Sequence, residues 1–203
     1  GPGFHLPPLP PGYHTLHVMA GDIRTDALVI AAPLRCFGPG ADAARLWGVS
    51  AQLYGLRRDD DLGIGDYPAA GRLAADAGAA GAAFLGLSPV HALFAADRTK
   101  ISPYSPSSRL FLETIHVDPR EVVGFAGSGA ARLLAAHGAE IEALRGAPLT
   151  DRAAVWAIAR PALEALWTDF RAVGDHDGFA TFRAAGGAAL ARHAAFEALS
   201  EHF

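Results

Sequence analysis

Residues 83–90 read Ala-Phe-Leu-Gly-Leu-Ser-Pro-Val, a short apolar run that ends at a proline and has the length of a buried strand. An alanine-rich stretch precedes it at residues 69–80, and this composition favours a helix. Residues 48–53 form another short, mostly apolar run. Strand, helix and strand in about 45 residues predict a βαβ unit, in which the two strands are parallel and the crossover is right-handed.

Local signals place the ends of the predicted helix. Asp66 is suited to accept a hydrogen bond from a free N–H of the first turn, and Pro68 fits that turn. Gly78 and Gly81 are stop signals at the other end.

The sequence before this unit has the character of a β hairpin. Residues 7–12 (Pro-Pro-Leu-Pro-Pro-Gly) predict a stiff extended lead-in and a turn. Residues 13–19 alternate between two faces, and residues 27–31 form a short apolar run that ends before Pro33. We therefore expect two antiparallel strands, the end of a small N-terminal β module at residues 1–46. A lone hairpin is marginally stable in water and needs packing partners.

From residue 128 onward the pattern is helical. Thr150 or Asp151 can cap a helix with one apolar stripe, and Pro161 is expected to kink or break it. A further helical segment is predicted from Gly187 to Phe203. The predicted fold class is α/β, with a βαβ unit and a long loop at residues 47–127 and a helical subdomain at 128–203. The apolar stripe of the helix that Thr150 or Asp151 caps consists of Val155, Ile158, Ala162, Leu166 and Phe170.

Composition excludes several functions. The net charge of −4 and the absence of a Lys/Arg cluster argue against nucleic acid or anionic lipid as a partner. Every apolar stretch is interrupted before about 18 residues, which argues against a membrane span. Cys36 is the single cysteine, so an intrachain disulfide is impossible and a reducing, cytoplasmic location is expected. The nine histidines show no metal-binding spacing, and no metal site is predicted.

Two long loops are candidates for a binding site. Residues 55–66 include Gly63-Ile64-Gly65, which indicates a tight turn more strongly than a phosphate cradle. Residues 102–108 read Ser-Pro-Tyr-Ser-Pro-Ser-Ser. Tyr104 in this loop either anchors it on the core or offers its ring to the apolar face of a sugar. In the second case Ser102 and Ser105 are placed to bind sugar hydroxyls.

The remaining polar residues give weaker signals. His91, just after the second strand, either lines a site or is a hydrogen-bonded structural histidine. Residues 59–61, three consecutive aspartates, are interpreted as a solvated loop face. None of the acidic residues is nominated as catalytic. Five glutamates on the helical patterns are expected to be exposed: Glu140, Glu142, Glu164, Glu197 and Glu201.

Three motifs resemble the bacterial 4-alpha-glucanotransferase (amylomaltase, or disproportionating enzyme) family. Residues 47–54 (Trp-Gly-Val-Ser-Ala-Gln-Leu-Tyr) with 63–66 (Gly-Ile-Gly-Asp) are similar to its first barrel strand and loop. Residues 84–94 (Phe-Leu-Gly-Leu-Ser-Pro-Val-His-Ala-Leu-Phe) are similar to its second strand. Residues 102–108 match its substrate-lining loop and are the most specific of the three. The resemblance covers nearly the whole chain and is strong from Trp47 to Ser108.

This resemblance implies retaining transfer of α-1,4-glucan segments between maltooligosaccharides, without metal or organic cofactor. It implies that the chain is the N-terminal portion of such an enzyme and contains the start of an incomplete (β/α)₈ barrel. Retention requires a carboxylate nucleophile and a carboxyl acid/base. The resemblance places both beyond Phe203, so this chain alone is expected to be inactive and to require the missing remainder of its barrel. Tyr104 corresponds to a donor-subsite contact, with Ser102 beside it.

Two other functions stay open. The chain could be a non-catalytic glycan-binding module that keeps the groove at Tyr104. It could also be a helical interaction protein whose functional surface lies between Thr150 and Phe203.

Overall fold

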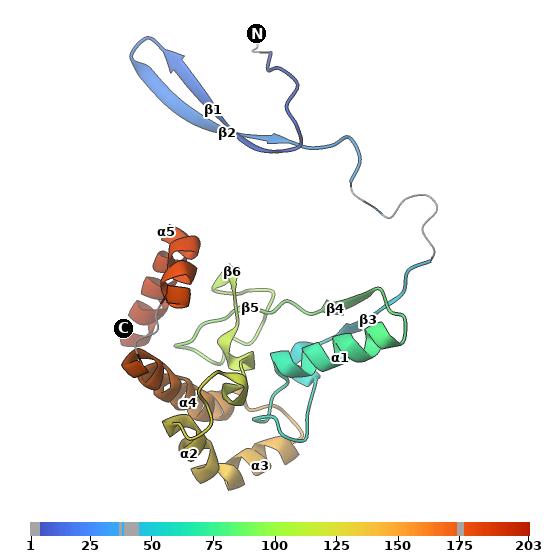
Figure 1. Ribbon diagram of the computed structural model, residues 1–203, viewed down its shortest axis with the longest axis vertical. Helices are drawn as coiled ribbons and strands as arrows, with labels where there is room; N and C mark the ends of the chain where they lie inside the picture. Colours follow the sequence, from blue (N-terminus) through green and yellow to red (C-terminus); the bar gives the residue numbers. More distant parts are fainter. Residues whose placement is uncertain (1–4, 37, 39–44, 174–176) are drawn as a thin grey trace. The chain divides into compact units, whose positions relative to one another are not determined.

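The computed structural model describes residues 5–36, 38, 45–173 and 177–203. The chain divides into two compact units, Gly1–Arg45 and Leu46–Phe203, and each is described by itself. Figure 1 labels their helices and strands.

The first unit contains the predicted hairpin. Strands β1 (Gly12–Ala20) and β2 (Ile23–Ala31) pair antiparallel over their whole length. Gly21, with φ of 60°, adopts the left-handed conformation that a two-residue turn requires. On β1 the even-numbered residues 12–18 are partly buried and the odd-numbered ones are exposed, so the predicted alternation is confirmed. Large apolar side chains remain exposed on both strands, among them Tyr13, Met19, Leu28 and Ile30.

The second unit begins with the predicted βαβ arrangement. Strands β3 (Gly48–Ala51) and β4 (Phe84–Leu87) pair in parallel, and helix α1 (Tyr67–Ala79) joins them and lies along the pair (Figure 1). Asp66 caps α1, since its Oδ1 accepts from Ala69 N at 2.8 Å. The strand, helix and cap predictions are confirmed, but the expectation that the second strand is buried was wrong, since Phe84 and Leu87 at the ends of β4 are exposed. In the described residues no strand beyond β4 joins this pair, and there is no closed barrel.

Two glycines let segments of this unit approach closely. A Cβ at Gly48 would collide with the backbone and ring of Phe84 on the neighbouring strand. A Cβ at Gly65 would collide with backbone atoms of Leu53 and Leu56, in and after the short 3₁₀ helix η1 (Leu53–Gly55). Gly65 N donates to Tyr54 O at 3.0 Å, which holds the loop after β3 against η1. The interpretation of residues 63–65 as a tight turn agrees with this close approach.

The segment after β4 is largely irregular, as expected from its prolines. A short antiparallel pair, β5 (His91–Ala92) and β6 (Ser108–Leu112), brackets the loop that contains Tyr104. Two 3₁₀ helices, η2 (Thr114–His116) and η3 (Pro119–Glu121), then lead into the helical part of the chain.

Four helices complete the second unit: α2 (Gly129–Ala136), α3 (Gly138–Gly146), α4 (Arg152–Val173) and α5 (Asp177–His202). Helix α4 is continuous through Pro161, so the proline does not break it. Burial of the neighbouring Ile158 and Ala162 offsets the hydrogen bond that proline cannot donate. Helix α5 begins at Asp177, earlier than predicted, but it is kinked at the non-helical Gly187, and its second part is the helical segment predicted from that residue.

The main apolar core lies between α4 and the segments packed on it. The first four residues of the predicted stripe are buried, whereas Phe170 near its end is 37% exposed. The core consists of Leu62, Ile64, Ile115, Ala130, Leu134, Ile141, Val155, Ile158, Ala159, Ala162 and Leu166.

In the described part of the chain no helix combines the length and apolar character that crossing a bilayer requires.

Candidate functional site

Tyr104 stands at the surface of the second unit with 70% of its area exposed. The anchoring interpretation of this side chain is therefore wrong, because a ring packed on the core would be buried. The flanking backbone forms a turn in which Ser105 N donates to Ser102 O at 3.1 Å. Prolines 103 and 106 stiffen this turn and reduce the entropy that ordering the ring on a ligand would cost.

Two grooves meet at Tyr104. One, of about 610 Å³, is lined by residues at the C-terminal ends of β3 and β4, including Gln52 and Ser88. The other, of about 760 Å³, runs towards the start of α4. Ser102 lines this second groove, whereas Ser105 is exposed and lines neither of the two. The second groove is lined by Tyr54, Gly55, Arg57, Ile101, Ser102, Pro103, Tyr104, Pro148, Leu149, Thr150 and Arg152.

The C-terminal end of the Tyr104 loop is fixed at Ser107. Its N–H donates to Ala92 O at 2.9 Å, and its hydroxyl lies 3.0 Å from Ala92 O, Leu93 O and Glu197 Oε1. One oxygen therefore joins the β5 segment to helix α5. The loop is held at this base while Tyr104 projects from it.

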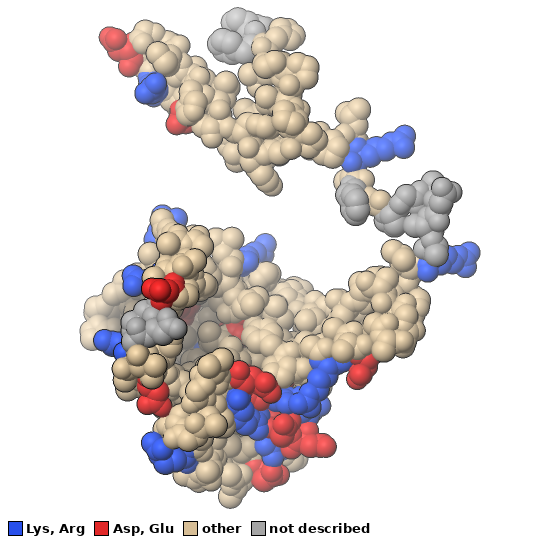
Figure 2. Space-filling view, in the orientation of Figure 1, with Lys and Arg blue, Asp and Glu red and all other residues tan. Residues whose placement is uncertain are grey.

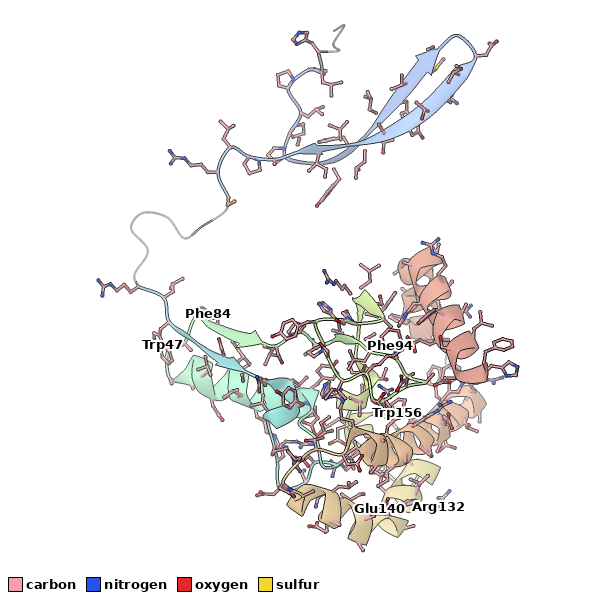
Figure 3. The ribbon with its side chains drawn as sticks, turned by 180° about the vertical axis from the view of Figure 1, so that it is seen from behind. Trp47, Phe84, Phe94, Arg132, Glu140 and Trp156 are labelled. Atoms are coloured by element: carbon pink, nitrogen blue, oxygen red, sulfur yellow. The ribbon has the colours of Figure 1, made fainter. Side chains whose placement is uncertain are left out.

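Helix α5 supports the same loop through several side chains. Glu197 Oε2 accepts from Ala95 N at 3.2 Å, and the His193 ring stacks on Phe111 at 4.4 Å between ring centres. Phe196 meets Phe94 edge to face, and Figure 3 shows Phe94 between the loop region and the helices. The prediction that Glu197 is a solvent-exposed helix residue was wrong, since its carboxylate bonds two segments about 100 residues earlier in the chain.

Asp61 corrects a second prediction. Residues 59–61 were interpreted as a solvated face, and Asp60 is indeed largely exposed, but Asp61 is fully buried. Arg57 holds its carboxylate through two hydrogen bonds of 2.8 and 3.0 Å, and the N–H groups of Arg58 and Gly63 donate to it. Burial acts to raise the pKa of Asp61, but these hydrogen bonds outweigh it and hold the pKa below its usual range.

Arg58 ties the same loop to η3. Its Nη2 lies 2.7 Å from Asp66 Oδ2 and 2.5 Å from Asp118 Oδ2, and Arg120 also binds Asp118. Burial would raise the pKa of Asp118, yet the hydrogen bonds of Arg120 and Arg58 keep it low. Figure 2 shows basic and acidic side chains lying next to each other around this part of the surface.

A buried carboxylate that the sequence did not reveal lines a small cavity next to the larger groove. Glu113 accepts from Arg98 Nη1 at 2.7 Å, from Leu93 N at 2.6 Å and from Ile115 N at 3.1 Å. Burial raises and these partners lower the pKa of Glu113, with a net decrease. Both oxygens of the Glu113 carboxylate therefore accept hydrogen bonds, and Arg98 pairs with its charge. The spacing of Glu113 from its partners carried no recognisable signal.

Glu113 lines a small cavity of about 20 Å³ that shares Tyr54 and Arg152 with the larger groove and has room for a single water molecule. His91, partly buried, borders it together with His116 and Arg152. His116 Nδ1 lies 2.7 Å from Gly65 O, and burial lowers the pKa of this imidazole. The described residues contain no group of three His, Cys, Asp or Glu side chains that could hold a metal ion.

The comparison with protein families identifies most of the second unit. The family model for 4-alpha-glucanotransferase matches residues 51–203. The 4-alpha-glucanotransferase of Haemophilus influenzae is 31% identical over 170 residues, covering 82% of this chain and 24% of the relative. That of Mycobacterium tuberculosis is 32% identical over 210 residues, covering 96% of this chain and 28% of the relative. The chain thus spans about a quarter of the length of these relatives.

A solved structure agrees with the fold. The amylomaltase from Corynebacterium glutamicum superposes with a TM-score of 0.73 at 24% identity, over 90% of this chain and 26% of that one. Sequence and fold point in the same direction, and the chain belongs to the 4-alpha-glucanotransferase family.

Proposed function

We propose that this chain is a segment of an enzyme that transfers α-1,4-glucan segments between maltooligosaccharides with retention. Its role is to supply one wall of the glucan-binding groove. The exposed ring of Tyr104, at the junction of two grooves beside the ends of two parallel strands, is the observation that carries the proposal. Ligand sites of barrel enzymes lie at this end of the strands.

The chemistry of the groove suits a sugar. An aromatic face packs on the apolar face of a pyranose, and Tyr54 lies along the same groove as Tyr104. The Ser102 hydroxyl lines the groove and can exchange hydrogen bonds with sugar hydroxyls. The groove volume is in the range of small-molecule sites. We assign Ser105 a contact at the outer edge of the loop.

The catalytic carboxylates are proposed to lie on polypeptide beyond residue 203. Retaining transfer needs two carboxyl groups about 5–5.5 Å apart, one of them free to attack the anomeric carbon. In the described residues the buried acids Asp61, Glu113 and Asp118 are each engaged by arginine. Because arginines engage these carboxylates, they support the proposal that the segment alone is inactive and requires the remainder of its barrel.

The proposal includes an architecture. Residues 1–46 are the end of an N-terminal β module, residues 47–127 are the first βαβ of a (β/α)₈ barrel with the Tyr104 loop, and residues 128–203 are a helical subdomain. Apolar side chains at the start of the parallel pair support a missing neighbour, since Trp47 and Phe84 are 49% and 55% exposed (Figure 3). The location is cytoplasmic, in keeping with the single cysteine.

Two measurements test this function. The purified chain, incubated with maltotriose, is expected to release no glucose, and turnover would refute the assignment of the carboxylates. Titration with maltoheptaose is expected to show binding that Tyr104→Ala weakens about tenfold, the scale of one aromatic contact. Tyr13→Ala, which removes an equally exposed tyrosine from the hairpin, is the matched control. Binding unaffected by Tyr104→Ala would remove the groove from the proposal.

A non-catalytic glycan-binding module remains the second candidate. It is favoured by the arginine partners that engage each of the buried carboxylates named above. This alternative predicts the same titration result, but it predicts no turnover when the missing part of the barrel is added as a separate polypeptide. Adding a polypeptide with the later barrel strands restores maltotriose turnover only if the chain is an enzyme segment.

A further inference from the structure

Arg152, the first residue of α4, lines both the larger groove and the small cavity next to it. Its side chain is partly buried, yet in the described part of the chain it takes part in no hydrogen bond or ion pair. Other arginines in similarly buried surroundings are neutralised: Arg57 by Asp61, Arg58 by Asp66 and Asp118, and Arg98 by Glu113. A partly desolvated cation without a counter-charge is costly, and an anion from solution relieves that cost.

The charges around Arg152 do not cancel it. Glu113 is the nearby carboxylate, but Arg98 already occupies it at 2.7 Å, so two guanidinium groups face one carboxylate. His116 adds no negative charge, and burial favours its neutral form. Asp151, which directly precedes Arg152, accepts a hydrogen bond from Ala154 N at the start of α4. In the groove itself the charge of Arg57 is paired with Asp61, which leaves Arg152 as the source of net positive charge.

The remaining wall of the groove is apolar and aromatic, with Tyr54, Tyr104, Ile101 and Leu149. We infer that this groove accepts a maltooligosaccharide that carries a phosphate monoester, with the sugar rings on the tyrosines and the phosphate on Arg152. A guanidinium binds phosphate oxygens with two parallel N–H groups, a geometry that a lysine does not reproduce. This inference rests on the proposed glucan groove and adds the charge of the ligand to it.

Titration calorimetry on the whole chain tests the inference with five probes. These are maltotriose phosphorylated at a terminal C6, maltose 1-phosphate, unmodified maltotriose, maltose and inorganic phosphate. At least one phosphorylated sugar is expected to bind about tenfold more tightly than its neutral counterpart, the effect of a charge-assisted hydrogen bond, and this preference should fall with added salt. Inorganic phosphate alone should bind more weakly than the phosphorylated sugar.

Variants identify the residue responsible. Arg152→Gln is expected to abolish the preference for phosphorylated over neutral sugar, and Arg152→Lys should restore part of that preference. Arg171→Gln removes the same charge from an exposed position near the end of α4 and should change nothing. Thermal unfolding of each variant establishes that it is folded.

The outcomes separate this inference from the proposed function. Equal affinity for phosphorylated and neutral sugars would overturn the inference and leave the glucan groove intact. Inorganic phosphate binding as tightly as the phosphorylated sugar would also overturn it, because the sugar would then contribute nothing. Binding of none of the sugars would overturn the proposed groove itself.

Discussion

Glu197 Oε1 lies 3.0 Å from the hydroxyl of Ser107, although 90 residues separate the two in sequence. The contact joins the last helix to the base of the loop that presents Tyr104. Because Glu197 also accepts from Ala95 N, one carboxylate bonds to the chain before and after the Tyr104 loop. The geometry of the candidate groove therefore depends on α5.

Glu197→Ala is expected to loosen the Tyr104 loop and to lower the free energy of unfolding by about 1–2 kcal/mol, the cost of losing two partly buried hydrogen bonds. Hydrogen exchange of amides 92–108 should quicken. Ser107→Ala should have a similar effect, and the double variant should be less destabilised than the sum, since both changes remove one contact. Glu164→Ala, which removes an exposed glutamate from α4, is the control. Unchanged exchange in Glu197→Ala would show that α5 does not hold the loop.

Asp61→Asn is expected to lower the free energy of unfolding by about 2 kcal/mol. The change removes the charge that holds Arg57 and replaces an acceptor by an NH₂ group facing other donors. Arg57 keeps about a third of its side chain exposed, so the cost stays below that of a fully buried pair. Asp59→Asn, two residues away at an exposed position, should change the free energy of unfolding by less than about 0.5 kcal/mol, as expected for a surface substitution. Urea denaturation of both variants measures the difference, and equal stabilities would contradict the buried role of Asp61.

Local patterns predicted the elements that depend on local chemistry. Asp66, Pro68 and the alanine-rich run were sufficient to place α1, and alternation was sufficient for β1. The Pro- and Ser-rich loop allowed two interpretations of Tyr104; its exposure contradicts the anchoring one, and the contact with a sugar stays a prediction.

Long-range pairing was beyond these patterns. Asp59, Asp60 and Asp61 are identical in type and adjacent, and only the fold turns Asp61 inward onto Arg57. Glu113 and Arg152 line the same small cavity from different elements, at a sequence separation that no motif marks. Pro161 was overestimated as a helix breaker because the burial of its neighbours on α4 outweighs one missing hydrogen bond.

Gly65→Ala is expected to destabilise the second unit by about 2 kcal/mol or more, because the new Cβ would overlap backbone atoms of Leu53 and Leu56, which cannot move aside as a side chain can. Gly71→Ala provides the matched control. Gly71 lies within α1 with open space at its Cβ position, so alanine should stabilise that helix by about 0.5–1 kcal/mol. Thermal unfolding should thus shift in opposite directions for the two substitutions. A neutral Gly65→Ala would contradict the close packing of the loop on η1.

His116 should make stability depend on pH below about 6.5, the ordinary pKa of histidine. Burial is the largest cause of its lowered pKa, while the contact with Gly65 O acts in the opposite direction. In this window the unfolded chain binds a proton that the folded chain does not, so protonation favours unfolding. The contribution of neutral His116 is complete above pH 6.5 and is lost as the pH falls towards the folded value. Urea denaturation at pH 7.5 and 5.5 should show this decrease.

The variant His116→Gln isolates this effect, since glutamine can still donate to Gly65 O but does not titrate. Its stability is expected to be lower than that of the parent at pH 7.5, because a buried ring that packs edge to face on Tyr67 is lost. Its decrease between pH 7.5 and 5.5 should nevertheless be smaller. His5→Gln, at an exposed position in the lead-in to the hairpin, should keep the full decrease. If His116→Gln kept the parent's pH dependence, protonation of another group would have to account for it.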